Sequence, residues 1–160
     1  EGGCTCHHVR YRMASAPLLC IAATAAGANA KEAHRLPNAL IETERLHLRA
    51  GAVGTPSGSG LGQQIARCPH CHAAVWGYFA GAGPLVAFVR VGTLDQPDQA
   101  PPDSHICAAS RQPWLALPAD AGGGRYDDRE AVWPSASLAR RQVLLPRINA
   151  YRAARGLDPA

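Results

Sequence analysis

The residues best suited to chemistry are two close pairs of cysteines at distant points of the chain. The first pair is Cys4-Thr5-Cys6, and the second is Cys68-Pro69-His70-Cys71. In a strand, side chains two residues apart point to the same face, so Cys4 and Cys6 can present both sulfurs to one ion. Cys68 and Cys71, three apart around a proline, form a tight turn of the zinc-knuckle kind. Four thiolates make a closed tetrahedral site, so we predict one structural zinc on Cys4, Cys6, Cys68 and Cys71.

Two other interpretations of these cysteines compete with a metal site. A lone CxxC is more often a redox pair, or two unrelated buried cysteines. Here a CxC pair and a CPxC pair occur together in one β-rich chain. This combination favours a metal site over a redox pair and over unrelated buried cysteines. His7, His8, His70 and His72 flank the cysteines, but four sulfurs already fill the coordination shell, so we expect these histidines to be exposed turn residues.

The remaining reactive residue types have ordinary explanations. Cys20 and Cys107 each stand alone in apolar surroundings, where a buried and unreactive thiol is expected. The charge run Asp127-Asp128-Arg129-Glu130 is typical of a solvated surface.

The composition favours one β-rich domain. At 160 residues, 47% of them hydrophobic, the chain can build one core, and a second full domain is not expected. Sixteen Gly and 13 Pro, with 18% charged residues, suit short strands and turns better than long amphipathic helices. We predict a mainly β fold, with residues 1–145 as a zinc-binding domain and residues 146–160 as a C-terminal tail with a short helix.

The cysteine usage points to a reducing compartment, and we expect a cytoplasmic protein. Six cysteines could form disulfides in a secreted protein, but two close pairs favour metal. The secreted alternative rests on an apolar run at 16–28 that ends in Ala28-Asn29-Ala30, an A-x-A cleavage pattern. A signal there would begin inside the chain and discard Cys4 and Cys6. No segment reaches the roughly 18 consecutive apolar residues of a membrane-spanning helix, so no membrane partner is expected.

Short apolar stretches between turn residues predict the strands. Alternation indicates strands at 9–12 and 46–48, while residues 74–79 and 85–91 are apolar runs expected to be adjacent core strands. Residues 64–67 lead into the second cysteine pair, and a short strand is expected around 105–107. The Gly-, Ser- and Pro-rich residues 51–62 and the glycines at 122–124 predict loops. Ser135 predicts the cap of a helix that Pro146 ends, and Gly156 would stop a final short helix.

The charge pattern excludes some function classes. The net charge of +4 is modest, and its clearest cluster lies in the helical C-terminal stretch, at Arg140, Arg141, Arg147, Arg152 and Arg155. A solvated helix face explains this cluster, and we expect no nucleic-acid partner. The sequence has no Gly-rich phosphate loop, Ser/His/Asp arrangement or HExxH helix, so nucleotide chemistry is not supported.

Several stretches together match one known pattern. They are Gly2-Gly3-Cys4-Thr5-Cys6 with Val9-Arg10-Tyr11, Asn38-Ala39-Leu40-Ile41-Glu42, Arg67-Cys68-Pro69-His70-Cys71 with Trp76, Val91-Gly92-Thr93-Leu94-Asp95, Pro102 to His105-Ile106, and Pro113-Trp114. Over most of residues 1–140 the chain resembles the glutathione-dependent formaldehyde-activating (GFA) family, which includes centromere protein V. The resemblance implies a β-tent fold and structural zinc on Cys4, Cys6, Cys68 and Cys71. It also implies a carbon-sulfur lyase activity that forms S-hydroxymethylglutathione from formaldehyde and glutathione, with glutathione or another small thiol as partner.

The chain departs from this family between residues 20 and 31. The family has a CxCxxC motif before the NALIE-like strand, and those three cysteines hold a second zinc with an open position. Here the interval reads CIAATAAGANAK, which lacks the motif. An open-site zinc lowers the pKa of a substrate thiol, so we predict that the second zinc is absent and that activity is lost or impaired. The family's Gly after the first CxC is replaced by His7, which predicts strain in that turn.

The departing segment is compatible with a shift of reading frame. Ile21 to Lys31 can be encoded so that the same bases, read one base earlier from a TGC codon for Cys20, give HCCHCRWCQRE, which contains CxCxxC. The leading hypothesis is therefore a GFA-like zinc protein with an intact structural site and a missing catalytic site. The competing hypothesis is a non-catalytic, zinc-supported binding or scaffold module. Neither hypothesis assigns a catalytic residue.

Overall fold

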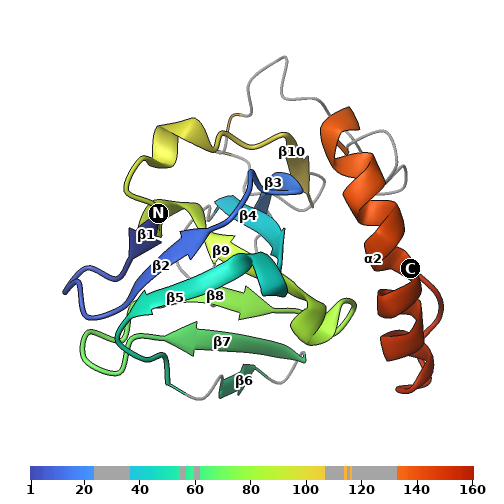
Figure 1. The fold of residues 1–160 in the computed structure, drawn as a ribbon, viewed down its shortest axis with the longest axis horizontal. Helices are drawn as coiled ribbons and strands as arrows, with labels where there is room; N and C mark the ends of the chain where they lie inside the picture. The colour runs from blue at the N-terminus through green and yellow to red at the C-terminus, as the bar shows by residue number, and fades with distance from the viewer. Residues whose placement is uncertain (24–36, 55–56, 60–61, 107–113, 115, 117–132) are drawn as a thin grey trace.

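In the part of the chain that the structure describes, the fold consists of two β-sheets and one long helix. The computed structural model describes residues 1–23, 37–54, 57–59, 62–106, 114, 116 and 133–160 (Figure 1). Within these residues, a three-stranded sheet has the order β1 (Gly2–Gly3), β2 (Arg10–Met13), β5 (Leu46–Ala50). The second sheet has seven strands, in the order β10 (Ser104–Ile106), β3 (Leu19–Ala23), β4 (Pro37–Glu42), β9 (Val86–Arg90), β8 (Ala74–Tyr78), β7 (Gln63–Arg67), β6 (Ser57–Ser59). The predicted mainly β fold is confirmed.

The predicted adjacency of the two core strands is confirmed. β8 and β9 are neighbours, with Trp76 opposite Val89 and Gly77 opposite Phe88, as their apolar runs predict. All described pairings are antiparallel except that of β10 with β3, which is parallel. The loop predicted at 51–62 contains the short strand β6, which pairs with β7. Backbone pairing at a sheet edge needs no apolar side chains. A strand rich in Gly and Ser therefore has the composition of a loop, and the sequence does not indicate it.

Strand β4 separates two apolar cores. Successive side chains of a strand point to opposite faces, so Ala39 and Ile41 enter one core while Leu40 enters the other. The first core also contains Tyr11 and Trp76 and extends to Cys4 and Cys68, which places two cysteines of the predicted site at its border. The second core is closed by the C-terminal helix. Both faces of β4 are therefore covered, and its six residues are buried or half-buried.

The helix α2 (Ser135–Ala153) is longer than predicted. Pro146 does not end it, and Ser135 is its first residue rather than its cap, which is Pro134. A proline inside a helix costs about 3 kcal/mol, but Leu144 and Ile148, on either side of it, pack into the second core and offset that cost. Gly156, with φ +66°, lies just beyond the helix end, where the Leu157 N–H bonds to the Arg152 carbonyl. Gly156 is therefore a helix stop signal, as predicted. It follows the single helix α2 and not a separate short helix.

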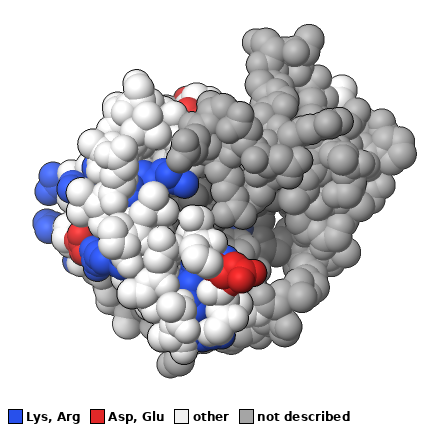
Figure 2. Space-filling view, turned by 90° about the vertical axis from the view of Figure 1, so that its right-hand side faces the viewer, with Lys and Arg blue, Asp and Glu red and all other residues white. Residues whose placement is uncertain are grey.

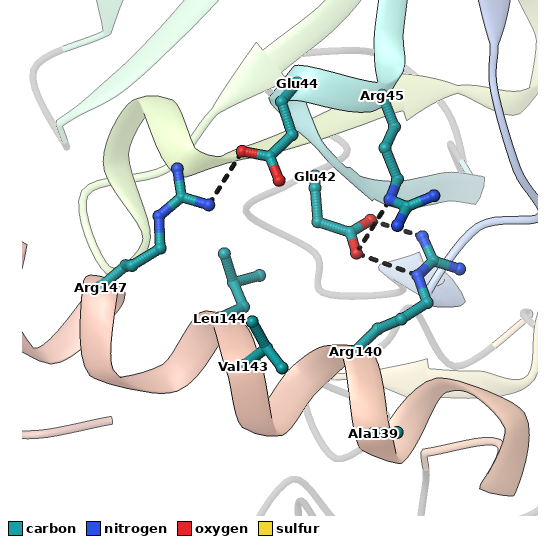
Figure 3. Close-up of a pocket in the computed structure, with 8 residues that line it drawn as sticks. All are labelled: Glu42, Glu44, Arg45, Ala139, Arg140, Val143, Leu144 and Arg147. Carbon is teal, nitrogen blue, oxygen red and sulfur yellow. Dashed lines mark hydrogen bonds and ion pairs between the residues drawn. The ribbon is translucent and has the colours of Figure 1, made fainter.

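Ion pairs attach α2 to the start of the turn after β4 (Figure 3). The Arg140 guanidinium donates to both carboxylate oxygens of Glu42, with Nε 2.9 Å from Oε1, and Arg140 also donates to the Ala16 carbonyl. Arg45 lies 3.5 Å from the same carboxylate. Burial raises the pKa of Glu42, but Arg140 and Arg45 outweigh burial and hold it below its ordinary value. Glu42 is therefore a buried anion that depends on its cationic partners.

The Arg140→Ala variant is expected to lose about 2–3 kcal/mol of unfolding free energy, because it leaves the buried Glu42 carboxylate with Arg45 alone. The side chain of Glu42 is only 7% exposed, so water replaces little of the lost partner. The matched control is Arg147→Ala, whose pair with Glu44 is 49% and 59% exposed and should contribute at most about 1 kcal/mol. Urea denaturation measures both; equal losses in the two variants would contradict this assignment.

Two of the C-terminal arginines, Arg147 and Arg155, are exposed, as the predicted solvated helix face requires, while the others are half-buried. Besides the pairs of Arg140 and Arg147, the Arg155 guanidinium stacks 3.8 Å from the Tyr151 ring centroid and Arg152 donates to the Gly81 carbonyl. On the face shown in Figure 2, basic side chains are scattered and interspersed with acidic ones and do not form a continuous stripe. In the part of the chain that the structure describes, no helix has the length and apolar character needed to cross a membrane.

Candidate metal centre

The four predicted cysteines come together in space. The two turns that carry them, between β1 and β2 and between β7 and β8, lie at the end of the molecule opposite α2 (Figure 1). Cys4 and Cys6 lie in the turn that joins β1 to β2, and Cys68 and Cys71 lie in the turn between β7 and β8. Each turn is closed by backbone hydrogen bonds, such as Cys4 N–H to the Val9 carbonyl and Cys68 N–H to the Ala73 carbonyl, both 3.0 Å. The two turns come from distant parts of the chain, and the sheets bring them together.

The geometry of the first pair differs from the prediction. We expected Cys4 and Cys6 to share a face of a strand, but strand β1 ends at Gly3 and the pair lies in a turn. The turn is completed by His7, whose φ of +59° is in the left-handed region that favours glycine. The predicted strain at His7 is confirmed. His72, after the second pair, has the same left-handed conformation with φ +58°.

The sulfur separations match a tetrahedral zinc site. Cys4 Sγ lies 3.5 Å from Cys6 Sγ, and Cys6 Sγ lies 3.7 Å from Cys68 Sγ. All four sulfurs lie within 4.8 Å of one another. Zinc–sulfur bonds of about 2.3 Å in a tetrahedron place the sulfurs about 3.8 Å apart. These separations suit the coordination of one ion by all four sulfurs.

Backbone N–H groups support the sulfurs from behind. The Val9 N–H donates to Cys4 Sγ at 3.2 Å, and the His70 N–H donates to Cys68 Sγ at 3.4 Å. Such bonds stabilise sulfur as thiolate, the form that binds metal. Sequence reasoning did not identify these donors, because a backbone donor is set by turn geometry and not by residue type.

The thiols compete for charge in the absence of a cation. The Ala73 N–H, then the Cys6 N–H, lowers the pKa of Cys71 to about 6. The His8 N–H lowers the pKa of Cys6, but burial and the Cys4, Cys71 and Cys68 thiols outweigh it and raise the pKa to about 12. One sulfur thus takes the negative charge while its neighbour keeps the proton, as expected for closely coupled groups. A divalent cation removes this competition, so the donor set fits Zn²⁺.

The flanking histidines lie outside the sulfur cluster. His7, His70 and His72 are exposed, as predicted, while His8 is half-buried. The rings of His8 and His70 stack with centroids 3.7 Å apart, so they connect the two turns by ring contact. In the described residues, the close group of potential metal ligands contains cysteines alone.

Cys20 is a buried thiol, as predicted. It is 3% exposed, and its N–H donates to Asp103 Oδ2 at 2.7 Å. Burial, with a smaller contribution from Asp103, raises the pKa of the Cys20 thiol to about 11, so it stays protonated at neutral pH. The predictions for Cys107, for residues 127–130 and for the glycines at 122–124 lie outside the described residues. So does most of the interval in which the family motif is missing, since strand β3 covers it only to Ala23.

A groove lies between α2 and the turn after β4. It is lined by Glu42, Glu44, Arg45, Ala139, Arg140, Val143, Leu144 and Arg147. Figure 3 shows that its charged side chains point toward one another. Both carboxylates already pair with arginines, so the groove is a packing seam. The pairs that Arg140 and Arg147 make join residues about a hundred positions apart, so no local sequence pattern indicates them.

Together, two β-sheets and a cluster of four cysteines define a β-rich protein with a candidate metal centre at the border of its core. The family profile described as glutathione-dependent formaldehyde-activating enzyme matches residues 1–110. The chain belongs to this family, as the resemblance predicted. No protein of curated function matches the chain. Among solved structures, the chain is similar to a protein from Rhodobacter sphaeroides at 16% identity and TM-score 0.45, over 59% of this chain and 86% of that one.

Proposed function

We propose that Cys4, Cys6, Cys68 and Cys71 bind one structural zinc ion. The observation that carries this proposal is the meeting of four sulfurs from two distant turns at separations suited to tetrahedral coordination. The two turns meet through the sulfurs and through the His8–His70 ring stack. Zinc there would tie the three-stranded sheet to the β7–β8 turn.

A closed four-thiolate site supports folding and leaves no position for a substrate. When bound in such a site, zinc supplies cross-linking and charge neutralisation. The backbone N–H groups of Val9 and His70 hold the sulfurs of Cys4 and Cys68 in place, and burial of these two cysteines excludes water from one side. Because the four thiols must stay reduced to bind metal, we place the protein in the cytoplasm.

The family's activity is the formation of S-hydroxymethylglutathione from formaldehyde and glutathione, and we propose that this chain has lost it. The support comes from the sequence: residues 20–31 lack the CxCxxC that would hold a second zinc with an open position. Without an open-site metal, the chain has no evident means of holding a thiol as thiolate. The second candidate is a non-catalytic binding or scaffold module, favoured by the same loss combined with a complete structural cluster.

The chain is expected not to accelerate exchange between free formaldehyde and the glutathione adduct above the spontaneous rate. The measurement is an exchange assay on the zinc-loaded protein, with and without protein in otherwise identical samples. A Cys20→Ser variant, which leaves the four-cysteine cluster complete, is the control for reaction at a free thiol. Clear catalysis by the parent chain would refute the loss of the catalytic site.

A further inference from the structure

The four cysteines of the cluster differ in their exposure to solvent. Cys4 and Cys68 are 2% and 0% exposed, and Cys71 is half-buried. Cys6 is exposed. An oxidant that approaches the cluster from solution therefore meets the Cys6 sulfur first. The remaining described cysteine, Cys20, is 3% exposed and lies away from the cluster, in strand β3.

We propose that Cys6 is an oxidation site for hydroperoxides and that its oxidation releases the metal from the cluster. This proposal rests on the zinc site of the proposed function. Exposure and thiolate character decide which cysteines react with peroxides, and a nearby second thiol decides whether a disulfide follows. In the zinc-bound cluster all four sulfurs are thiolates, so exposure is what distinguishes them. Cys6 combines exposure with two neighbouring sulfurs, Cys4 Sγ at 3.5 Å and Cys68 Sγ at 3.7 Å.

The reaction balances with hydrogen peroxide as the oxidant. The Cys6 thiolate attacks one peroxide oxygen, the O–O bond breaks, and the hydroxide that leaves takes a proton to become water. Cys6 is then a sulfenic acid, oxidised by two electrons. The thiolate of Cys4 or Cys68 attacks its sulfur, the S–O bond breaks, and the second hydroxide leaves as water with a second proton. Overall, two thiolates, one peroxide and two protons give one disulfide and two waters.

The product can no longer hold zinc in a four-thiolate site. Neither sulfur of a disulfide is anionic, so two of the four ligands are lost in one step. A thiol reductant reverses the step and restores the site. The chain would thus couple its metal content, and with it the link between the two cysteine turns, to the presence of peroxide.

The first experiment uses the zinc-loaded parent chain. Zinc content is measured before oxidation, which tests the zinc site separately. Hydrogen peroxide is then added at limiting amounts with dimedone, which traps sulfenic acid, and released zinc is followed with a chromogenic chelator. We expect the first label on Cys6, resolved from Cys4 by peptide fragmentation, and zinc release that dithiothreitol reverses in the absence of dimedone. First labelling of Cys71, Cys20 or any other cysteine would overturn the proposal.

Two variants compare the exposed sulfur with its half-buried neighbour. Cys6→His replaces the oxidisable sulfur by a nitrogen ligand that zinc also accepts. It is expected to slow zinc release by peroxide at least 10-fold. Cys71→His leaves Cys6 in place and should release zinc at about the parent rate. Equal rates for Cys6→His and the parent would contradict the proposal; if Cys6→His does not bind zinc, the labelling of the parent decides.

Discussion

The Cys68→Ser variant is expected to lose its zinc and most of its folded structure. Cys68 is fully buried, and its sulfur accepts a hydrogen bond from the His70 N–H. It lies in one of the two turns, far apart in the sequence, that the metal would join. Structural zinc contributes on the order of 10 kcal/mol to folding in small domains, as much as the whole unfolding free energy of a typical domain. Cys4→Ser should behave in the same way, because Cys4 holds the other turn.

Circular dichroism and zinc content measure this effect together. The matched control is Cys20→Ser, which also replaces a buried cysteine by serine but outside the cluster. It should keep its zinc and lose only the roughly 1–3 kcal/mol expected when a polar group is buried. Removal of zinc from the parent with a chelator should reproduce the Cys68→Ser spectrum. If Cys68→Ser keeps the parent's spectrum and zinc content, the four-cysteine site is wrong.

The second large effect concerns the missing open-site metal. Restoring the CxCxxC spacing with Ala23→Cys, Ala25→Cys and Ala28→Cys is expected to raise zinc from one to two ions per chain. These positions begin after Ile21 and Ala22, which are buried in strand β3 and stay unchanged. Three thiolates leave one coordination position open, and a thiol bound there has a lowered pKa. Binding of glutathione should therefore appear with the second ion.

The control for this variant is the serine version, Ala23→Ser, Ala25→Ser and Ala28→Ser, which changes the same positions without adding metal ligands. It should keep one zinc and bind no glutathione. Metal analysis and equilibrium dialysis with labelled glutathione compare the two proteins. A triple-cysteine variant that still holds one zinc would show that residues 20–31 are not a degraded metal-binding segment.

The cluster could be predicted from the sequence because it depends on residue types at short spacing. Cys4 with Cys6, and Cys68 with Cys71, are local patterns. Metal binding is the simplest explanation of two such pairs in one β-rich chain. The backbone geometry around Cys4 and Cys6 was harder to predict than the cluster itself. A turn, not a strand, brings Cys4 and Cys6 together, because the chain reverses at His7 in a left-handed conformation that residue type alone does not indicate.

The C-terminal helix shows the opposite case. Pro146 is a valid local stop signal, yet α2 continues because Leu144 and Ile148 pack against residues from strands more than fifty positions away. The pairing of Arg140 with Glu42 is likewise a tertiary contact, across 98 positions, that no local pattern shows. Strand β6 was missed for a related reason, since its pairing with β7 is made by the backbone. Local signals predicted the metal ligands and several strands, among them β2, β5, β8 and β9, whereas long-range packing determined the length of the helix.

The zinc content per folded chain can be measured on the parent protein by native mass spectrometry together with elemental analysis. The four sulfurs lie within 4.8 Å of one another and fill one tetrahedral shell, so the account predicts one tightly bound ion per chain. Loss of that ion should require denaturation, oxidation or a strong chelator. A folded chain without zinc would contradict the structural site, and a chain with two zinc ions would contradict the claim that the open-site metal is missing.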